Sequence, residues 1–181
     1  MAIETIIAYV GLGSNLADRA GNLMLAVRGL LEAHLIVSRL SAVYETAPHG
    51  VDNSHQNYLN MVAEVRVANV TPEQMLARML RVEYLLGRRR DAAGKAPRTV
   101  DLDLLLFGEL AHHNHFLTVP HPRLHERAFV LVPLDEIAPT LVHPVFKLTP
   151  GELLKRLVDK QTVKRWQPEL LQTERFAPAQ N

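Results

Sequence analysis

Residues 99–107, which read TVDLDLLLF, constrain the fold of this chain more than any other segment. Alternating polar and apolar residues lead into an unbroken apolar run, a pattern typical of a strand in the centre of a sheet. Side chains two apart on a strand point to the same face. We therefore predict that Asp101 and Asp103 project together, while Leu102 and Leu104 pack on the opposite face.

The segments before this strand predict an α+β fold. Further strands are expected at residues 5–12, 36–46 and 57–68. Asp18 is the expected N-cap of a helix after the first strand, and Thr71 with Gln74 forms a capping-box signature before a second helix. The resulting order of strand, helix, strand, strand, helix, strand matches the split βαβ, or ferredoxin-like, pattern.

C-terminal additions to this core are expected as well. They comprise an edge hairpin at 110–118 and short helices near 127–137 and 151–159. We expect one domain over residues 1–165 and a tail over residues 166–181, where no periodicity is evident.

Composition excludes several classes of function. The chain has 181 residues, no cysteine and a net charge of +1, so disulfides and thiolate metal sites are excluded and a broad nucleic-acid interface is disfavoured. No apolar run approaches the ~20 residues of a membrane span, and the first residues do not resemble a signal peptide. We expect a cytoplasmic protein.

A cationic segment precedes the paired acids. Its charged side chains are those of Arg88, Arg89, Arg90, Lys95 and Arg98. Arginine forks suit phosphate oxygens, and Mg²⁺ commonly takes one or two carboxylates together with substrate phosphates. Acids beside clustered arginines are what phosphoryl transfer requires, although a solvated strand face and a solvated basic loop remain the alternatives.

Other motifs are weaker. The stretch GLGSN at residues 11–15 lacks the spacing of a phosphate-binding loop and favours a tight turn. His112, His113 and His115 lie in the expected hairpin with no carboxylate evident nearby, which favours incidental exposure. Aromatic and amide side chains that suit a flat, polar-edged ring occur at Tyr58, Asn60 and Phe129, but such aromatics more often belong to a core.

Five stretches together resemble one family. They read GLGSN, YETAPHG, QNYLNMVAEV, PRTVDLDLLLFG and LTVPHPRLHERAFVLVPLDEIAP. Over about residues 6–160 they resemble the hydroxymethyldihydropterin pyrophosphokinases, and the last two in that order are highly specific. The resemblance implies a ferredoxin-like core, ATP as diphosphate donor, 6-hydroxymethyl-7,8-dihydropterin as acceptor, and two Mg²⁺ ions.

The resemblance also implies roles for individual residues. Asp101 and Asp103 would hold both metal ions, and Arg88 and Arg98 would contact the phosphates. Residues matching the ATP site are Glu83, Arg90, Arg98, Thr118, His121 and Arg127. Residues matching the pterin pocket are Thr46, His49, Tyr58, Asn60 and Phe129, with the ring held between Tyr58 and Phe129.

This chain departs from the family pattern at three positions. Lys95 replaces a loop aromatic, His49 stands where a small aliphatic is common, and Pro122 stands where some members carry an aromatic. Two rival interpretations remain: a metal-dependent nucleotidyltransferase and a non-catalytic ferredoxin-like RNA-binding module. We expect small-molecule substrates, no nucleic-acid or membrane partner, and a monomer.

Overall fold

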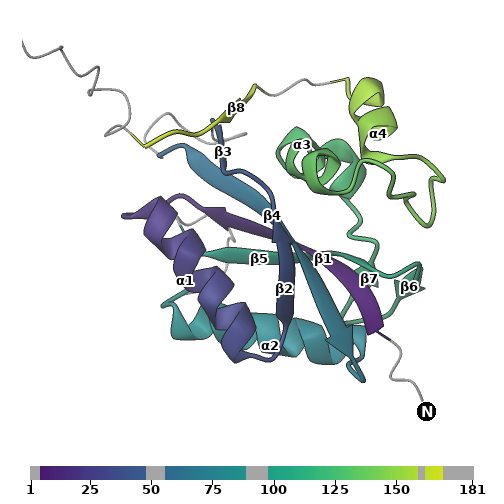
Figure 1. The fold of residues 1–181 in the computed structure, drawn as a ribbon, viewed down its shortest axis with the longest axis horizontal. Helices are drawn as coiled ribbons and strands as arrows, with labels where there is room; N and C mark the ends of the chain where they lie inside the picture. The colour runs from purple at the N-terminus through teal and green to yellow at the C-terminus, as the bar shows by residue number, and fades with distance from the viewer. Residues whose placement is uncertain (1–4, 48–55, 89–97, 159–161, 169–181) are drawn as a thin grey trace, which may run out of the picture.

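A computed structural model describes residues 5–47, 56–88, 98–158 and 162–168. The predicted site residues His49 and Arg90, and the replacement Lys95, lie outside the described residues. The described residues form a mixed α and β fold with a six-stranded sheet, a separate two-stranded sheet and four α-helices (Figure 1).

The elements follow one another in this order: β1 (Thr5–Ser14), α1 (Arg19–Glu32), β2 (Ile36–Leu40), β3 (Tyr44–Thr46), β4 (Tyr58–Ala68), α2 (Pro72–Leu85), β5 (Asp101–Phe107), β6 (His112–His113), β7 (Thr118–Val119), a 3-10 turn (Leu124–Glu126), α3 (Ala128–Ile137), α4 (Pro150–Arg156) and β8 (Val163–Arg165).

The main sheet is antiparallel in every described pairing, in the order β5-β1-β4-β3-β8, with β2 also paired to β4. The single strand predicted at 36–46 is therefore two strands. Between them, the Ser41 backbone N–H donates to the Val62 carbonyl, and the Val62 N–H donates to Ser41 Oγ, each at 2.9 Å. The Ser41 side chain thus takes the place of a backbone acceptor where the strand breaks.

Helices cover both faces of the sheet (Figure 1). Helices α1 and α2 pack on one face with a core that includes Leu23, Leu30 and Met79. Helix α3 packs on the other face, where its Leu131 and Leu134 are fully buried, and α4 packs against α3. The described helices include none that is long and apolar enough to cross a membrane.

The prediction that residues 99–107 form a central strand is wrong, because strand β5 lies at one end of the strand order. Its apolar run is explained by cover on both faces, since Leu104 belongs to one helical core and Leu105 to the other. The β6–β7 hairpin lies beside it, and the His121 N–H donates to the Leu105 carbonyl at 2.8 Å. Burial on two faces produces the same sequence pattern at either position.

The helix ends follow the sequence signals closely. Asp18 caps α1 by accepting from the Gly21 N–H at 2.9 Å, and Thr71 and Gln74 form the predicted capping box. Thr149 and Glu152 form a second capping box at α4. Strand β8 is the main element that the sequence did not indicate, and it pairs with β3.

The loop after α3 contains a buried histidine that makes fold stability depend on pH. His143 Nδ1 accepts from the N–H groups of Val145 and Phe146, both at 3.2 Å. Burial, reinforced by the nearby charge of His125, lowers the pKa of His143 to about 4. The unfolded chain then binds the proton more readily, so stability falls as the pH drops from the ordinary histidine range towards 4.

We predict that His143→Asn, which keeps an acceptor near the same backbone groups, flattens this pH dependence. Between pH 7 and pH 4 the wild type should lose about 1–3 kcal/mol more unfolding free energy than the variant. Urea titrations at several pH values measure the difference. Parallel stability profiles for the two proteins would contradict the assignment.

Candidate active site

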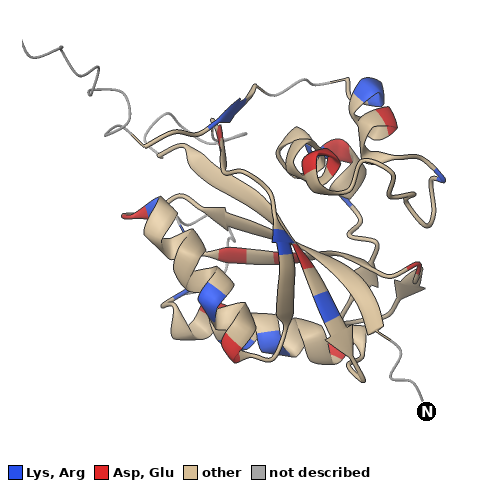
Figure 2. Cartoon of the chain, in the orientation of Figure 1, with Lys and Arg blue, Asp and Glu red and all other residues tan. Residues whose placement is uncertain are grey.

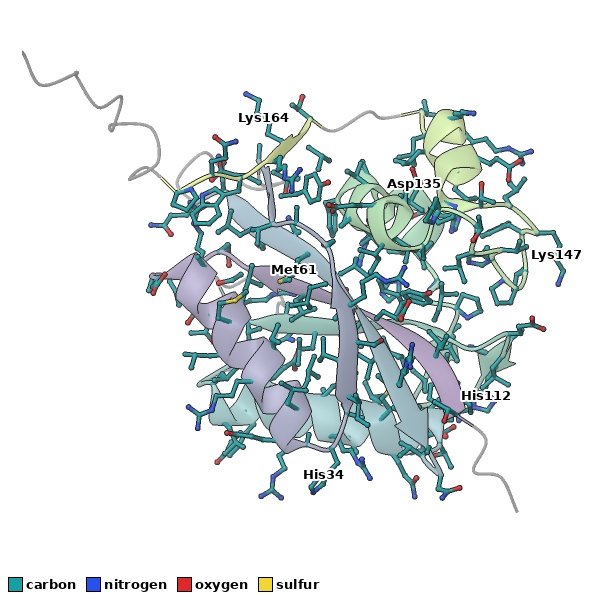
Figure 3. The ribbon with its side chains drawn as sticks, viewed as in Figure 1. His34, Met61, His112, Asp135, Lys147 and Lys164 are labelled. Carbon is teal, nitrogen blue, oxygen red and sulfur yellow. The ribbon has the colours of Figure 1, made fainter. Side chains whose placement is uncertain are left out.

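A pocket of about 400 Å³ opens where β1, β3, β4 and β5 meet the start of α3. Among the predicted site residues, the pocket is lined by Thr46, Tyr58, Asn60, Arg88, Arg98, Asp101, Asp103, Arg127 and Phe129. The structure therefore brings together segments from across the chain. Met61, which also lines the pocket, lies near the middle of the sheet in Figure 3.

Two glycines of the GLGSN motif form part of the pocket wall. Gly11 and Gly13 lie within strand β1, opposite Asp103 and Asp101 respectively, so the predicted tight turn at this motif is wrong. A Cβ atom at Gly13 would lie 3.4 Å from Asn60 Oδ1. The absence of side chains at these positions leaves room beside the acids.

The paired acids lie on one face of β5 and are surrounded by guanidinium groups. Arg88 and Arg98 each donate from Nη1 to a different carboxylate oxygen of Asp101. Arg127 Nη1 donates to Asp103 Oδ2 at 3.1 Å. Figure 2 shows acidic segments on β5 within the sheet. The site therefore concentrates negative charge and offsets it with three cations.

The backbone at Arg98 is fixed by an asparagine that the sequence analysis did not single out. Asn15 Oδ1 accepts from the Arg98 N–H at 2.7 Å, and the Asn15 N–H donates to the Arg98 carbonyl at 3.2 Å. This two-way pairing ties the end of the GLGSN motif to the entrance of β5. Burial lowers the pKa of Arg98, but the charge and the hydrogen bond of Asp101, together with the charges of Tyr58 and Asp103, outweigh it and the net shift is upward.

Glu83 lies behind the pocket and does not line it. Its side chain is buried at the end of α2, where Oε1 accepts from the Leu102 N–H at 2.8 Å and from Arg88 Nη1. The same carboxylate thus supports the β5 backbone and one of the arginines that contacts Asp101. These contacts hold the Glu83 carboxylate against other groups of the protein.

The other wall of the pocket suits a flat, polar-edged ligand. Asn60 Nδ2 donates to Thr46 Oγ1 at 3.0 Å, and both side chains are buried. Tyr58 stands opposite Thr46 in the β3–β4 pairing. From the side of α3, Phe129 reaches the pocket, and the Arg127 guanidinium carbon lies 5.6 Å from its ring centre.

Thr118 and His121 line a neighbouring pocket of about 340 Å³ and not the first one. Burial lowers the pKa of His121, although the charge of Asp103 opposes this. His121 Nδ1 accepts from the Arg123 N–H at 3.1 Å, so a neutral ring carries its proton on Nε2. Thr118 Oγ1 lies 2.7 Å from His113 Nδ1.

The hairpin histidines have a carboxylate partner that the sequence did not reveal. His112 Nε2 lies 2.9 Å from Glu73 Oε1 in α2. Figure 3 places His112 far from Lys164 of β8, across the molecule. Among the described residues, no group of three or more His, Cys, Asp or Glu side chains is arranged to hold a metal ion.

Arg123 and Glu126 also line the main pocket. The sequence places Arg123 with Arg127 in a basic segment that could form an anion-contacting wall, whereas it gives no signal for Glu126. Their side chains contact each other, with Arg123 Nε 3.4 Å from Glu126 Oε2. The basic character of the turn before α3 is therefore the signal for Arg123 alone.

Paired carboxylates beside three guanidinium groups, in a pocket that two aromatic side chains also line, define a class: enzymes that act on a phosphorylated ligand and a planar heterocycle. A model of the 7,8-dihydro-6-hydroxymethylpterin-pyrophosphokinase (HPPK) family matches residues 9–139. The chain belongs to this family.

Relatives and solved structures agree with this membership. The chain is 44% identical to the 2-amino-4-hydroxy-6-hydroxymethyldihydropteridine pyrophosphokinase of Bacillus subtilis over 72% of this chain and 77% of that protein. It is 36% identical to the protein of the same name from Haemophilus influenzae, over 88% and 98%. The Plasmodium falciparum HPPK-DHPS structure has a similar fold, with a TM-score of 0.68 at 17% identity, over 85% of this chain and 46% of that one.

We predict that Glu83→Ala lowers the free energy of unfolding by about 1–3 kcal/mol, because the buried Leu102 N–H loses its acceptor. Glu83→Gln keeps an acceptor oxygen and should cost less. Urea unfolding of both variants gives the comparison. Equal losses would mean that the Leu102 hydrogen bond contributes nothing.

Proposed function

We propose that this protein transfers diphosphate from ATP to 6-hydroxymethyl-7,8-dihydropterin, releasing AMP and the pterin diphosphate in folate biosynthesis. The observation that carries this proposal is the arrangement of one pocket. Its β5 side holds two acids and three arginines, and its other walls hold a buried amide on β4 together with the aromatic side chains of Tyr58 on β4 and Phe129 on α3. Family membership supports the same reaction.

The acid pair fits a divalent metal. Asp101 and Asp103 offer hard oxygen ligands on one strand face, each partly exposed, with side-chain exposures of 24% and 36%. In the part of the chain that the structure describes, their ionic partners are arginines, whose charge a metal could replace. We propose that they bind two Mg²⁺ ions, which when bound would offset charge on the phosphates.

The protein's own groups would then orient both substrates. Asn60 would read the polar edge of the pterin, with Tyr58 and Phe129 stacking on its faces. The hydroxymethyl oxygen would attack the β-phosphorus, the bond to the α-phosphate oxygen would break, and AMP would leave as the hydroxyl proton is lost. Arg88, Arg98 and Arg127 would stabilise charge on the transferring group.

We propose that the other residues of the ATP site contact the side of ATP that faces away from the main pocket. Thr118 and His121 lie in the neighbouring pocket, and a neutral His121 would donate from Nε2 to a phosphate oxygen. Glu83 would act through Arg88. Arg90 and His49 stay predictions for the ATP and pterin sites.

The rival interpretations are not favoured. In a nucleotidyltransferase the Gly-Ser pair contacts phosphate, but Ser14 is fully buried and its Oγ accepts from Asn22 Nδ2 of α1 at 3.3 Å. An RNA-binding sheet needs an open face with aromatic side chains. Here Tyr9, Val62 and Leu105 on that face are buried under α3.

We also propose that the core of this fold is ferredoxin-like. The strand order β5-β1-β4-β3, with α1 and α2 on one face, supports a ferredoxin-like core to which α3, α4 and β8 are added. We also propose a cytoplasmic monomer, with a domain that ends near residue 165.

We predict that purified protein converts ATP to AMP only when both Mg²⁺ and 6-hydroxymethyl-7,8-dihydropterin are present. Chromatography of the nucleotides identifies the product, and omission of each component provides the controls. Release of ADP, release of free pyrophosphate, or AMP formation without the pterin would overturn the proposed reaction.

We predict a division of roles between arginine and aspartate. Arg98→Ala should slow single-turnover transfer strongly while leaving the ATP dissociation constant within about threefold, because the transferring group demands its charge mainly in the transition state. Asp103→Ala should impair both productive nucleotide binding and rate, by several kcal/mol overall (on the order of 3–5). Near-normal rates for Asp103→Ala at ordinary Mg²⁺ would contradict this division.

A further inference from the structure

One guanidinium group lies behind the proposed pterin pocket and connects three elements. Arg19 is the first residue of α1, and its Nη1 donates to Glu45 Oε1 at 2.8 Å and to the Asn57 carbonyl at 2.7 Å. Glu45 is the middle residue of β3, and Asn57 immediately precedes β4. One nitrogen atom therefore links the start of a helix to two neighbouring strands.

The two positions that Arg19 contacts, one within β3 and one just before β4, are each next to a pocket residue. Side chains alternate along a strand, so Glu45 points away from the pocket while its neighbour Thr46 lines it. Consistent with this, Glu45 stands opposite Leu59, which belongs to the core under α1 and α2. Asn57 is bonded through its carbonyl group, next to Tyr58, which lines the pocket.

Helix stability does not account for an arginine at this position. A cation gains nothing from the helix dipole at an N-terminus and is disfavoured there. The first turn of α1 contains no acidic residue, and the carboxylate of the N-cap residue Asp18 is hydrogen-bonded to the Gly21 N–H. Its favourable contacts are those with β3 and the start of β4, where the side chains of Arg19 and Glu45 are only 22% and 30% exposed.

We propose that Arg19 is a positioning residue for the heteroaromatic substrate. By holding Glu45 and the Asn57 carbonyl together, it fixes the spacing between Thr46 on β3 and Tyr58 on β4. That spacing sets where the Asn60 amide, which donates to Thr46 Oγ1, meets the edge of the ring. The inference rests on the proposed function, since it concerns the pterin side of the pocket.

The test compares Arg19→Met with Arg19→Lys, and uses Arg28→Met as the matched control. Arg28 lies on the same helix and forms an exposed ion pair with Glu32, with Nε 2.7 Å from Oε1. Calorimetry measures the dissociation constants of the pterin, in the presence of a non-hydrolysable ATP analogue and Mg²⁺, and of the ATP analogue alone. Thermal unfolding is followed for every variant.

Arg19→Met should weaken pterin binding by about 5- to 30-fold, because a displaced wall leaves the buried amide poorly matched to the ring. Binding of the ATP analogue should change less than about twofold, since its proposed contacts lie on β5 and beyond. Arg19→Lys should recover much of the affinity, because one ammonium nitrogen can donate to both acceptors. Arg28→Met should leave both constants unchanged.

A double-mutant cycle identifies the route of the effect. Glu45→Gln should weaken pterin binding, and adding it to Arg19→Met should cost little more, because the two residues act through one contact. Equal losses for pterin and ATP analogue, or a loss of melting temperature with unchanged pterin affinity, would overturn the role of Arg19. If the wild type itself binds no pterin, the proposed function fails instead.

Discussion

The two-residue repeat of β5 is the constraint on which the rest of the site depends. Leu102 and Leu104 are buried in the core under α1 and α2, and the geometry of a strand then forces Asp101 and Asp103 onto the opposite face. Two carboxylates held this close repel each other unless cations offset them. Because the packing of Leu102 and Leu104 places the two acids together, the arginines that contact these acids are needed to offset their charge.

Much of this arrangement could be predicted from the sequence, because it follows from local periodicity and capping. The helix caps, the acid pair and the strand at β4 all have short-range signals. The break at Ser41 has none, because a serine side chain that replaces a backbone acceptor is indistinguishable in sequence from any other serine in a strand. The edge position of β5 was also hidden, since burial on two faces reads like a central strand.

The site residues also differ in how well the sequence predicts them. Side chains that face a ligand carry unusual chemistry, and paired acids, arginines and an amide between aromatics are visible in sequence. Side chains that hold those groups in place act through ordinary contacts to backbone atoms. Asn15 bonds the backbone of Arg98, and Glu83 bonds the backbone of Leu102. Many polar residues can make such bonds, so only the fold reveals which ones do.

The break between β2 and β3 also explains how α3 reaches the site. Where the strand breaks, the Ala42 N–H donates to Glu136 Oε2 at 2.9 Å, and Tyr44 donates its hydroxyl to the same oxygen at 3.1 Å. Glu136 lies near the end of α3, so the interruption between β2 and β3 leaves the Ala42 N–H available to anchor this helix. The start of the same helix presents Phe129 to the pocket, just after Arg127. An unbroken strand would have used the Ala42 N–H within the sheet, and α3 would have lacked this attachment near its C-terminal end.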